Sequence, residues 1–195
     1  MNSPTDPPAA RGAYALVTAL TLVRMPLAAA FAGVLLVGDR GWTTTLAAVA
    51  LLTLSEISDG LDGYLARRLG AASRFGALLD PYSDSISRIT IYWALAATDR
   101  TFACVPLVLA LRDVTVAYCR ILWIGANRSG GALLSGKLKA IVQGVGAFTL
   151  ILWPHLLPQW PGLAPAMSWA VIVVTLLSLV EYVGQTLPLL REPSR

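Results

Sequence analysis

Two apolar stretches, each with acidic residues at one end, decide the expected fold: residues 43–68 read TTTLAAVALLTLSEISDGLDGYLARR, and residues 76–98 read GALLDPYSDSISRITIYWALAAT. A helix that crosses a bilayer needs about 20 mostly apolar residues, so each stretch is long enough for one crossing. The connection between them is short. The pattern therefore predicts an antiparallel hairpin of two membrane helices whose acidic ends lie together.

The rest of the 195-residue chain has the same apolar character. Hydrophobic residues make up 56% of it and charged residues 13%, and its mean hydropathy is +0.65. Soluble domains carry about twice that share of charged residues, so a multidomain soluble enzyme is excluded. The apolar segments predict spans at about residues 13–37, 43–68, 76–98, 102–126, 136–157 and 163–190. We therefore expect an all-α integral membrane bundle of six transmembrane helices.

The distribution of basic residues predicts the orientation of this bundle. The N-terminal segment, the second and fourth connections and the C-terminus carry Arg11, Arg67, Arg68, Arg74, Arg128, Lys137, Lys139, Arg191 and Arg195. The opposite side has only Arg40 and Arg100 between the spans. By the positive-inside rule both termini are expected in the cytoplasm, with residues 1–12 as a flexible tail and 13–190 as the membrane domain. The net charge of +4 fits anionic lipid headgroups, and no basic stripe with interleaved aromatics suggests nucleic acid.

Acidic residues inside spans are the most informative feature. An ionised side chain within a membrane helix costs about 2.5 to 3.5 kcal/mol and persists where it is paired or functional. Asp59 and Asp62 share one helix face, and so do Asp80 and Asp84. The hairpin brings the two pairs together, and four converging carboxylates predict a site for Mg²⁺ or Mn²⁺. Two ions about 3.5 to 4 Å apart would fit such a site.

Glycines and arginines surround these acids. Gly60, Gly63, Gly70 and Gly76 lie beside them, together with Arg67, Arg68 and Arg74. Glycine lets a ligand approach the backbone closely, and arginine supplies positive charge, so the group suits a phosphate-rich anion. The alternative is that the glycines serve helix packing and the arginines follow the positive-inside rule.

The whole pattern reads Asp59, two residues, Asp62-Gly63, two residues, Ala66-Arg67, eight residues, Gly76, three residues, Asp80, three residues, Asp84. It resembles the signature of the CDP-alcohol phosphotransferase family, and the resemblance extends to the six spans. It implies transfer of a substituted phosphate from a CDP-linked donor to an alcohol, with release of CMP, at a two-metal site facing the cytoplasm. The four aspartates are then the implied metal ligands, and Asp84 is also the implied base. Gly63, Arg67 and Gly76 are the implied nucleotide contacts.

A second group of charges lies in the fourth and fifth predicted spans. Arg112, Arg120, Lys137 and Lys139 suggest a cationic pocket for a phosphorylated acceptor. Only Arg112 has a carboxylate beside it in the sequence, that of Asp113. The alternative is that Arg112 simply pairs with Asp113, while the two lysines anchor the helix at the membrane surface.

Within the family, the chain is most similar to phosphatidylglycerophosphate synthases. The resemblance rests on Thr21 to Arg24, on Arg112 with Asp113, and on Gly136 to Lys139. It implies CDP-diacylglycerol as donor, glycerol 3-phosphate as acceptor and a homodimer. Val17, Thr18 and Ala140 depart from the usual residues of that subfamily. Inositol phosphate therefore stays open as the acceptor, as do serine, choline and inositol.

A divalent-cation transporter is the alternative from another class of protein. A transporter would place acids along the depth of the membrane and repeat its halves in inverted order. Here the acids cluster at one depth and no inverted repeat is found. The sequence therefore favours an enzyme.

Overall fold

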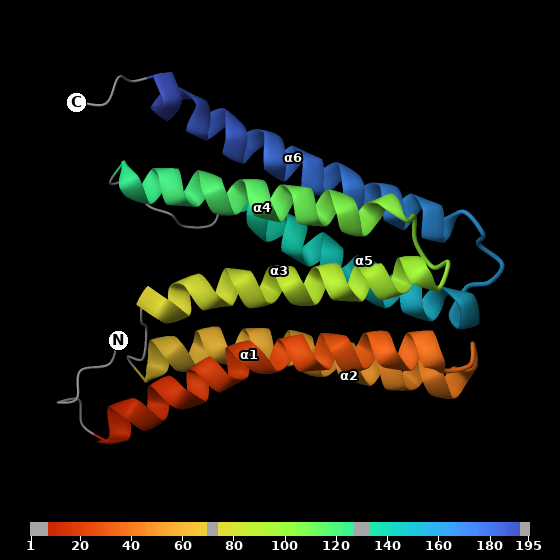
Figure 1. Ribbon diagram of the computed structural model, residues 1–195. Coiled ribbons are helices and arrows are strands. Elements are labelled where there is room, and N and C mark those ends of the chain that lie inside the picture. The colour runs from red at the N-terminus through yellow and green to blue at the C-terminus, as the bar shows by residue number, and fades with distance from the viewer. Residues whose placement is uncertain (1–7, 70–73, 127–132, 192–195) are drawn as a thin grey trace. The chain divides into compact units, whose positions relative to one another are not determined.

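The chain forms six α-helices within the residues that the structure, a computed structural model, describes, namely 8–69, 74–126 and 133–191. They are α1 (Pro8–Val37), α2 (Trp42–Arg68), α3 (Arg74–Ala97), α4 (Cys104–Gly125), α5 (Leu134–Leu156) and α6 (Leu163–Arg191) (Figure 1). An all-helical fold with these six segments is what the sequence predicted. The largest difference is that α1 begins at Pro8 rather than near residue 13, since proline suits the first turn of a helix. Residues 1–7 of the expected tail lie outside the described residues.

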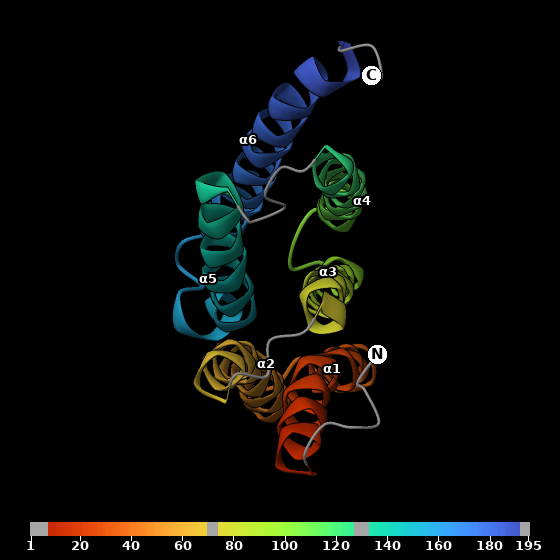
Figure 2. The same ribbon diagram turned by 90° about the vertical axis from the view of Figure 1, so that its left-hand side faces the viewer.

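The chain divides into two units, Met1–Ala94 and Leu95–Arg195, and the division falls near the end of α3. In the first unit α1 packs along α2, and the two helices lie side by side in both views (Figures 1 and 2). Ser83 on α3 donates a hydrogen bond of 2.5 Å to the carbonyl oxygen of Thr21 on α1. In the second unit α6 packs against both α4 and α5. Each unit carries one of the two groups of charged residues that the sequence singled out.

Three of the helices are long and apolar enough to cross a membrane: Tyr14–Val37, Trp42–Leu65 and Leu163–Leu190. Among the remaining helices, α4 shows where its charged residues lie. Its buried residues include Arg112 and Asp113, whereas Leu111 is 59% exposed and Tyr118 67% exposed. A soluble protein buries its large apolar side chains and exposes its charged ones, so this inverted arrangement is typical of a helix that faces lipid.

Two connections show how the helices are joined. Asp39, between α1 and α2, accepts hydrogen bonds from the hydroxyl of Thr44 at 2.7 Å and the N–H of Gly41 at 3.1 Å. These bonds, the Thr44 bond first, hold the pKa of Asp39 below its usual value. Asp99, between α3 and α4, has a φ of 60°, a conformation that aspartate tolerates better than most residues.

Candidate active site

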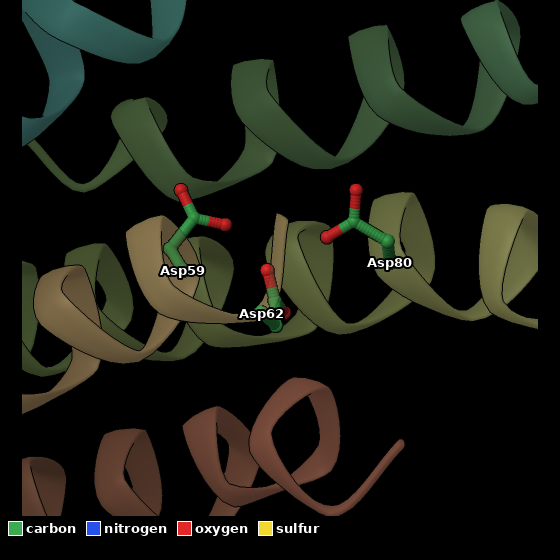
Figure 3. A group of neighbouring side chains, drawn as sticks. All are labelled: Asp59, Asp62 and Asp80. Atoms are coloured by element: carbon green, nitrogen blue, oxygen red, sulfur yellow. The ribbon is translucent and has the colours of Figure 1, made fainter. Parts of the chain in front are cut away.

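Three carboxylates gather where α2 and α3 lie together. Asp59 and Asp62 come from α2 and Asp80 from α3, and one oxygen of each lies within 4.8 Å of the others (Figure 3). Asp62 is buried, Asp59 is half-buried and Asp80 is exposed. Three of the four predicted acids therefore converge, as the helical hairpin requires. Carboxylate oxygens at this spacing are the donor set that a hard divalent cation prefers, so the residues fit such a metal.

Asp84, the fourth acid, is joined to this group through Arg24. Arg24 of α1 donates from Nη1 to Asp59 Oδ1 at 2.5 Å and from Nη2 to Asp84 Oδ1 at 2.7 Å. Its Nη1 also lies 3.6 Å from Asp80 Oδ1. The Arg24 side chain is only 2% exposed. One buried guanidinium thus links three of the four acids.

Thr21 places a second group from α1 in the same site. Its hydroxyl lies 2.9 Å from Asp62 Oδ2, to which it donates. Thr21 and Arg24 are three residues apart and therefore share one face of α1. In the sequence, Thr21 to Arg24 formed only part of a family resemblance, and their place among the acids was not predicted. The signal was present, because a charge such as Arg24 in the middle of an apolar span persists where it is paired.

Arg88 and Glu56 form a further ion pair beside the acids. Arg88 of α3 contacts Glu56 of α2 through Nη1 at 3.0 Å and donates from Nη2 at 3.2 Å. Its Nε donates to Asp84 Oδ1 at 3.4 Å. Four carboxylates contact these two guanidiniums, namely those of Glu56, Asp59, Asp80 and Asp84, while Asp62 bonds the Thr21 hydroxyl. Such a concentration of carboxylates would favour binding of divalent cations.

The implied nucleotide contacts lie at the helix ends beside the acids. Gly63 and Arg67 belong to the last turns of α2, and Gly76 to the first turn of α3. The side chain of Arg67 lies outside the described residues. Arg68 is exposed and donates to the hydroxyl of Tyr64, one turn earlier on its own helix, at 3.0 Å. This contact gives Arg68 a structural role on α2.

The second unit holds a buried charge cluster on α4 and α5. Asp113 Oδ1 accepts hydrogen bonds from Arg112 Nη1 at 2.9 Å and from Lys139 Nζ at 2.8 Å. Arg112 also donates from Nη2 to Ser178 of α6 at 2.6 Å. The pairing of Arg112 with Asp113 is the alternative that the sequence left open. Lys139 does have a carboxylate partner, Asp113. The two residues lie 26 positions apart in the sequence, so the pairing was not predicted.

Arg120 and Lys137 differ in their surroundings. Arg120 is partly buried and donates from Nη2 to the hydroxyl of Tyr182 at 3.2 Å, whereas Lys137 is exposed. Three buried donors in this region, Arg112 Nε, Arg120 Nε and Ser135 Oγ, have no hydrogen-bond partner among the described residues. Buried donors without acceptors are costly, so a bound anion would stabilise this cluster. Of the four predicted acceptor residues, Lys137 is the one at the surface.

Comparison with known proteins shows the family. A family model described as CDP-alcohol phosphatidyltransferase matches residues 14–179, from the second turn of α1 into α6. The chain belongs to the CDP-alcohol phosphatidyltransferase family. The match spans both charge clusters and confirms the family predicted from the aspartate motif. It also favours a transferase over the cation transporter.

Several relatives in this family carry a more specific name. The chain is 28% identical to the CDP-diacylglycerol--glycerol-3-phosphate 3-phosphatidyltransferase of Bacillus subtilis (strain 168) over 181 residues, 87% of this chain and 93% of that protein. It is 34% identical to the protein of the same name in Treponema pallidum (strain Nichols) over 113 residues, 57% of this chain and about half, 52%, of that protein. A Mycobacterium tuberculosis protein (strain ATCC 25618 / H37Rv), provisionally named a cardiolipin synthase, is 31% identical over 156 residues, 79% of this chain and 72% of that protein.

Proposed function

We propose that this protein is a membrane phospholipid synthase that transfers the phosphatidyl group of CDP-diacylglycerol to glycerol 3-phosphate and releases CMP. The observation that carries the proposal is the convergence of Asp59, Asp62 and Asp80 within a complete family motif. The names of the Bacillus and Treponema relatives specify this donor and this acceptor.

We propose that Asp59, Asp62, Asp80 and Asp84 hold two divalent cations, Mg²⁺ or Mn²⁺. The hard carboxylate oxygens and the spacing of Asp59, Asp62 and Asp80 support this assignment. When bound, the cations would neutralise the diphosphate of the donor and stabilise the departing CMP. Thr21 and Arg24 would orient the carboxylates from α1, because they donate hydrogen bonds to Asp62, Asp59 and Asp84.

Residues of the chain then carry the chemical step. Asp84 takes the proton of the acceptor hydroxyl, whose oxygen attacks the phosphorus of the phosphatidyl group. The new P–O bond forms as the bond to the CMP phosphate breaks, and CMP leaves with the electron pair. Arg67 places positive charge beside the CDP phosphates, and Gly63 and Gly76 let the nucleotide approach the helix backbones.

The acceptor phosphate is assigned to the charge cluster of the second unit. Arg112 and Lys139 both contact the carboxylate of Asp113, and their positive charges lie together in this cluster. Arg120 and the buried hydroxyl of Ser135 add donors that lack partners among the described residues. A phosphate monoester has the charge and the acceptor oxygens to satisfy them.

We expect Arg120→Ala to raise the KM for glycerol 3-phosphate about tenfold, equivalent to about 1.4 kcal/mol. Lys137→Ala should raise it about threefold at most, because an exposed charge is screened by water and salt. The KM for CDP-diacylglycerol should stay unchanged in both variants. Steady-state kinetics of CMP release in mixed micelles measures all three values. An unchanged acceptor KM in Arg120→Ala, or a change in the donor KM alone, would contradict the assignment.

We further propose that all six helices cross the cell membrane, that both termini and the active site face the cytoplasm, and that the protein is a homodimer. The basic residues in the fourth connection and at the helix ends beside the second and fourth connections support the orientation. Labelling of single cysteines from either side of sealed vesicles tests the topology. Cysteines placed at residues 72 and 130 should react from the cytoplasmic side only.

The deciding experiment measures CMP release by the purified protein with CDP-diacylglycerol and a panel of acceptors. The panel contains glycerol 3-phosphate, inositol phosphate, serine, choline, inositol and phosphatidylglycerol. Phosphatidylglycerol is included because cardiolipin carries two phosphatidyl groups on one glycerol, and one relative is provisionally named a cardiolipin synthase. Preference for glycerol 3-phosphate supports the proposal, and preference for any other acceptor of the panel overturns the acceptor assignment.

A further inference from the structure

Tyr182 of α6 lies at the centre of the charge cluster in the second unit, although its sequence position gives no sign of this. It is fully buried, with 0% of its surface exposed. Its hydroxyl accepts two hydrogen bonds, from Arg120 Nη2 at 3.2 Å and from the backbone N–H of Leu133 at 3.0 Å. One phenol thus ties α4 and the residue that precedes α5 to α6.

The ring of Tyr182 lies beside two arginines, Arg112 and Arg120. The guanidinium carbon of Arg112 lies 5.2 Å from the ring centroid and that of Arg120 lies 5.6 Å from it. Trp123 stacks on the ring at 5.3 Å with an interplanar angle of 9°. A guanidinium over an aromatic face is attracted by the negative charge of that face. Tyr182 can therefore hold two like charges near one another.

Neighbouring residues fix the position of Tyr182 itself. Trp123 Nε1 donates to Thr186 Oγ1 at 2.9 Å, and this hydroxyl bonds the backbone carbonyl of Tyr182 at 2.8 Å. At Gly136, near the start of α5, a Cβ would lie 3.3 Å from the Tyr182 hydroxyl and 3.6 Å from Arg112 Nη2. The first distance is tight and the second is an ordinary contact, so a side chain at residue 136 would press on the Tyr182 hydroxyl.

We propose that Tyr182 is a positioning residue that sets the geometry of Arg112 and Arg120 for the phosphate of the acceptor. The inference rests on the proposed function, because it assigns the acceptor phosphate to these arginines. Tyr182 holds one guanidinium by its ring and the other by its ring and hydroxyl. Arginines fixed in this way lose less conformational freedom when the anion binds.

Two variants separate the parts played by the hydroxyl and the ring. Tyr182→Phe removes the bonds to Arg120 and Leu133 and keeps the ring, so we expect the KM for glycerol 3-phosphate to rise about fivefold. Tyr182→Leu removes the ring as well, and a rise of about thirtyfold is expected. The kcat and the KM for CDP-diacylglycerol should stay near the wild-type values in Tyr182→Phe. Isothermal titration with glycerol 3-phosphate, without donor, should show the same loss of affinity.

Thr175→Val is the matched control on α6. It removes another buried hydrogen bond, which Thr175 accepts from Gln143 at 3.0 Å and in which neither arginine takes part. This variant should lose thermal stability to a degree similar to Tyr182→Phe and keep the wild-type acceptor KM. If Tyr182→Phe impairs the donor KM, the acceptor KM and kcat to the same extent, Tyr182 has a general structural role and the proposal is overturned.

Arg120→Ala separates failure of this inference from failure of the proposed function. If Arg120→Ala raises the acceptor KM and Tyr182→Phe does not, the acceptor site stands and the role of Tyr182 is wrong. If neither variant changes the acceptor KM or the binding of glycerol 3-phosphate, both assignments are wrong.

Discussion

Each of the variants Asp59→Asn, Asp62→Asn, Asp80→Asn and Asp84→Asn is expected to lower CMP release by at least about a thousandfold, because each removes one negative charge from the cluster that would hold the cations. Asparagine keeps the size of the side chain and one oxygen, so the fold should be retained. Binding of Mn²⁺, followed by electron paramagnetic resonance, gives a readout that does not depend on turnover. Asparagine at any one of the three clustered acids should weaken Mn²⁺ binding by more than about tenfold.

Excess chelator should abolish turnover of the wild type, and Mg²⁺ or Mn²⁺ should restore it. Asp39→Asn is the control for the four variants, because Asp39 lies in the connection between α1 and α2 and its described hydrogen bonds go to Gly41 and to Thr44 at the start of α2, at the opposite end of that helix from the acids. Full activity in excess chelator would contradict the two-metal assignment.

Asp84→Asn should differ from the other three variants. Asp84 bonds Arg24 and Arg88 and lies outside the group of carboxylates within 4.8 Å of one another. If its main role is to accept the proton of the acceptor, the chemical step should fail while CDP-diacylglycerol still binds. Equal loss of donor binding in all four variants would remove this distinction.

The acid cluster was predictable from the sequence because it depends on short spacings. Asp59 and Asp62 lie three residues apart, and a short connection leads to Asp80, so helix geometry and one hairpin suffice to bring them together. The six helices were predictable for a similar reason, since each is a continuous apolar segment bounded by polar residues.

The partners of these charges were not predictable, because they depend on tertiary packing. Arg24 reaches Asp59 across 35 residues and Asp84 across 60. Arg120 reaches Tyr182 across 62 residues. A single sequence shows that a buried charge needs a partner, but only the packing of α1 on α2, or of α6 on α4, shows which residue provides it.

Arg24 gives the second large effect that we expect. Arg24→Met keeps much of the side-chain volume and removes the charge, which leaves Asp59, Asp80 and Asp84 without their shared guanidinium. Removing one partner of a buried ion pair costs about 3 to 5 kcal/mol. The carboxylates here are partly exposed, at 41%, 57% and 29%, so water offsets part of the loss. We therefore expect Arg24→Met to lower the free energy of unfolding by about 2 kcal/mol when it is measured in the presence of chelator.

Addition of Mg²⁺ tests whether this loss of stability arises in the acid cluster. Bound Mg²⁺ replaces positive charge among the carboxylates, so the stability difference between Arg24→Met and the wild type should shrink as Mg²⁺ is added. Turnover should stay about a hundredfold lower, because Asp59 and Asp84 lose the donor that orients them. Arg40→Met, at an exposed arginine of the α1–α2 connection, is the control and should change neither quantity. If Arg24→Met is as stable as the wild type in chelator and releases CMP at the normal rate, α2 and α3 position the acids without help from α1.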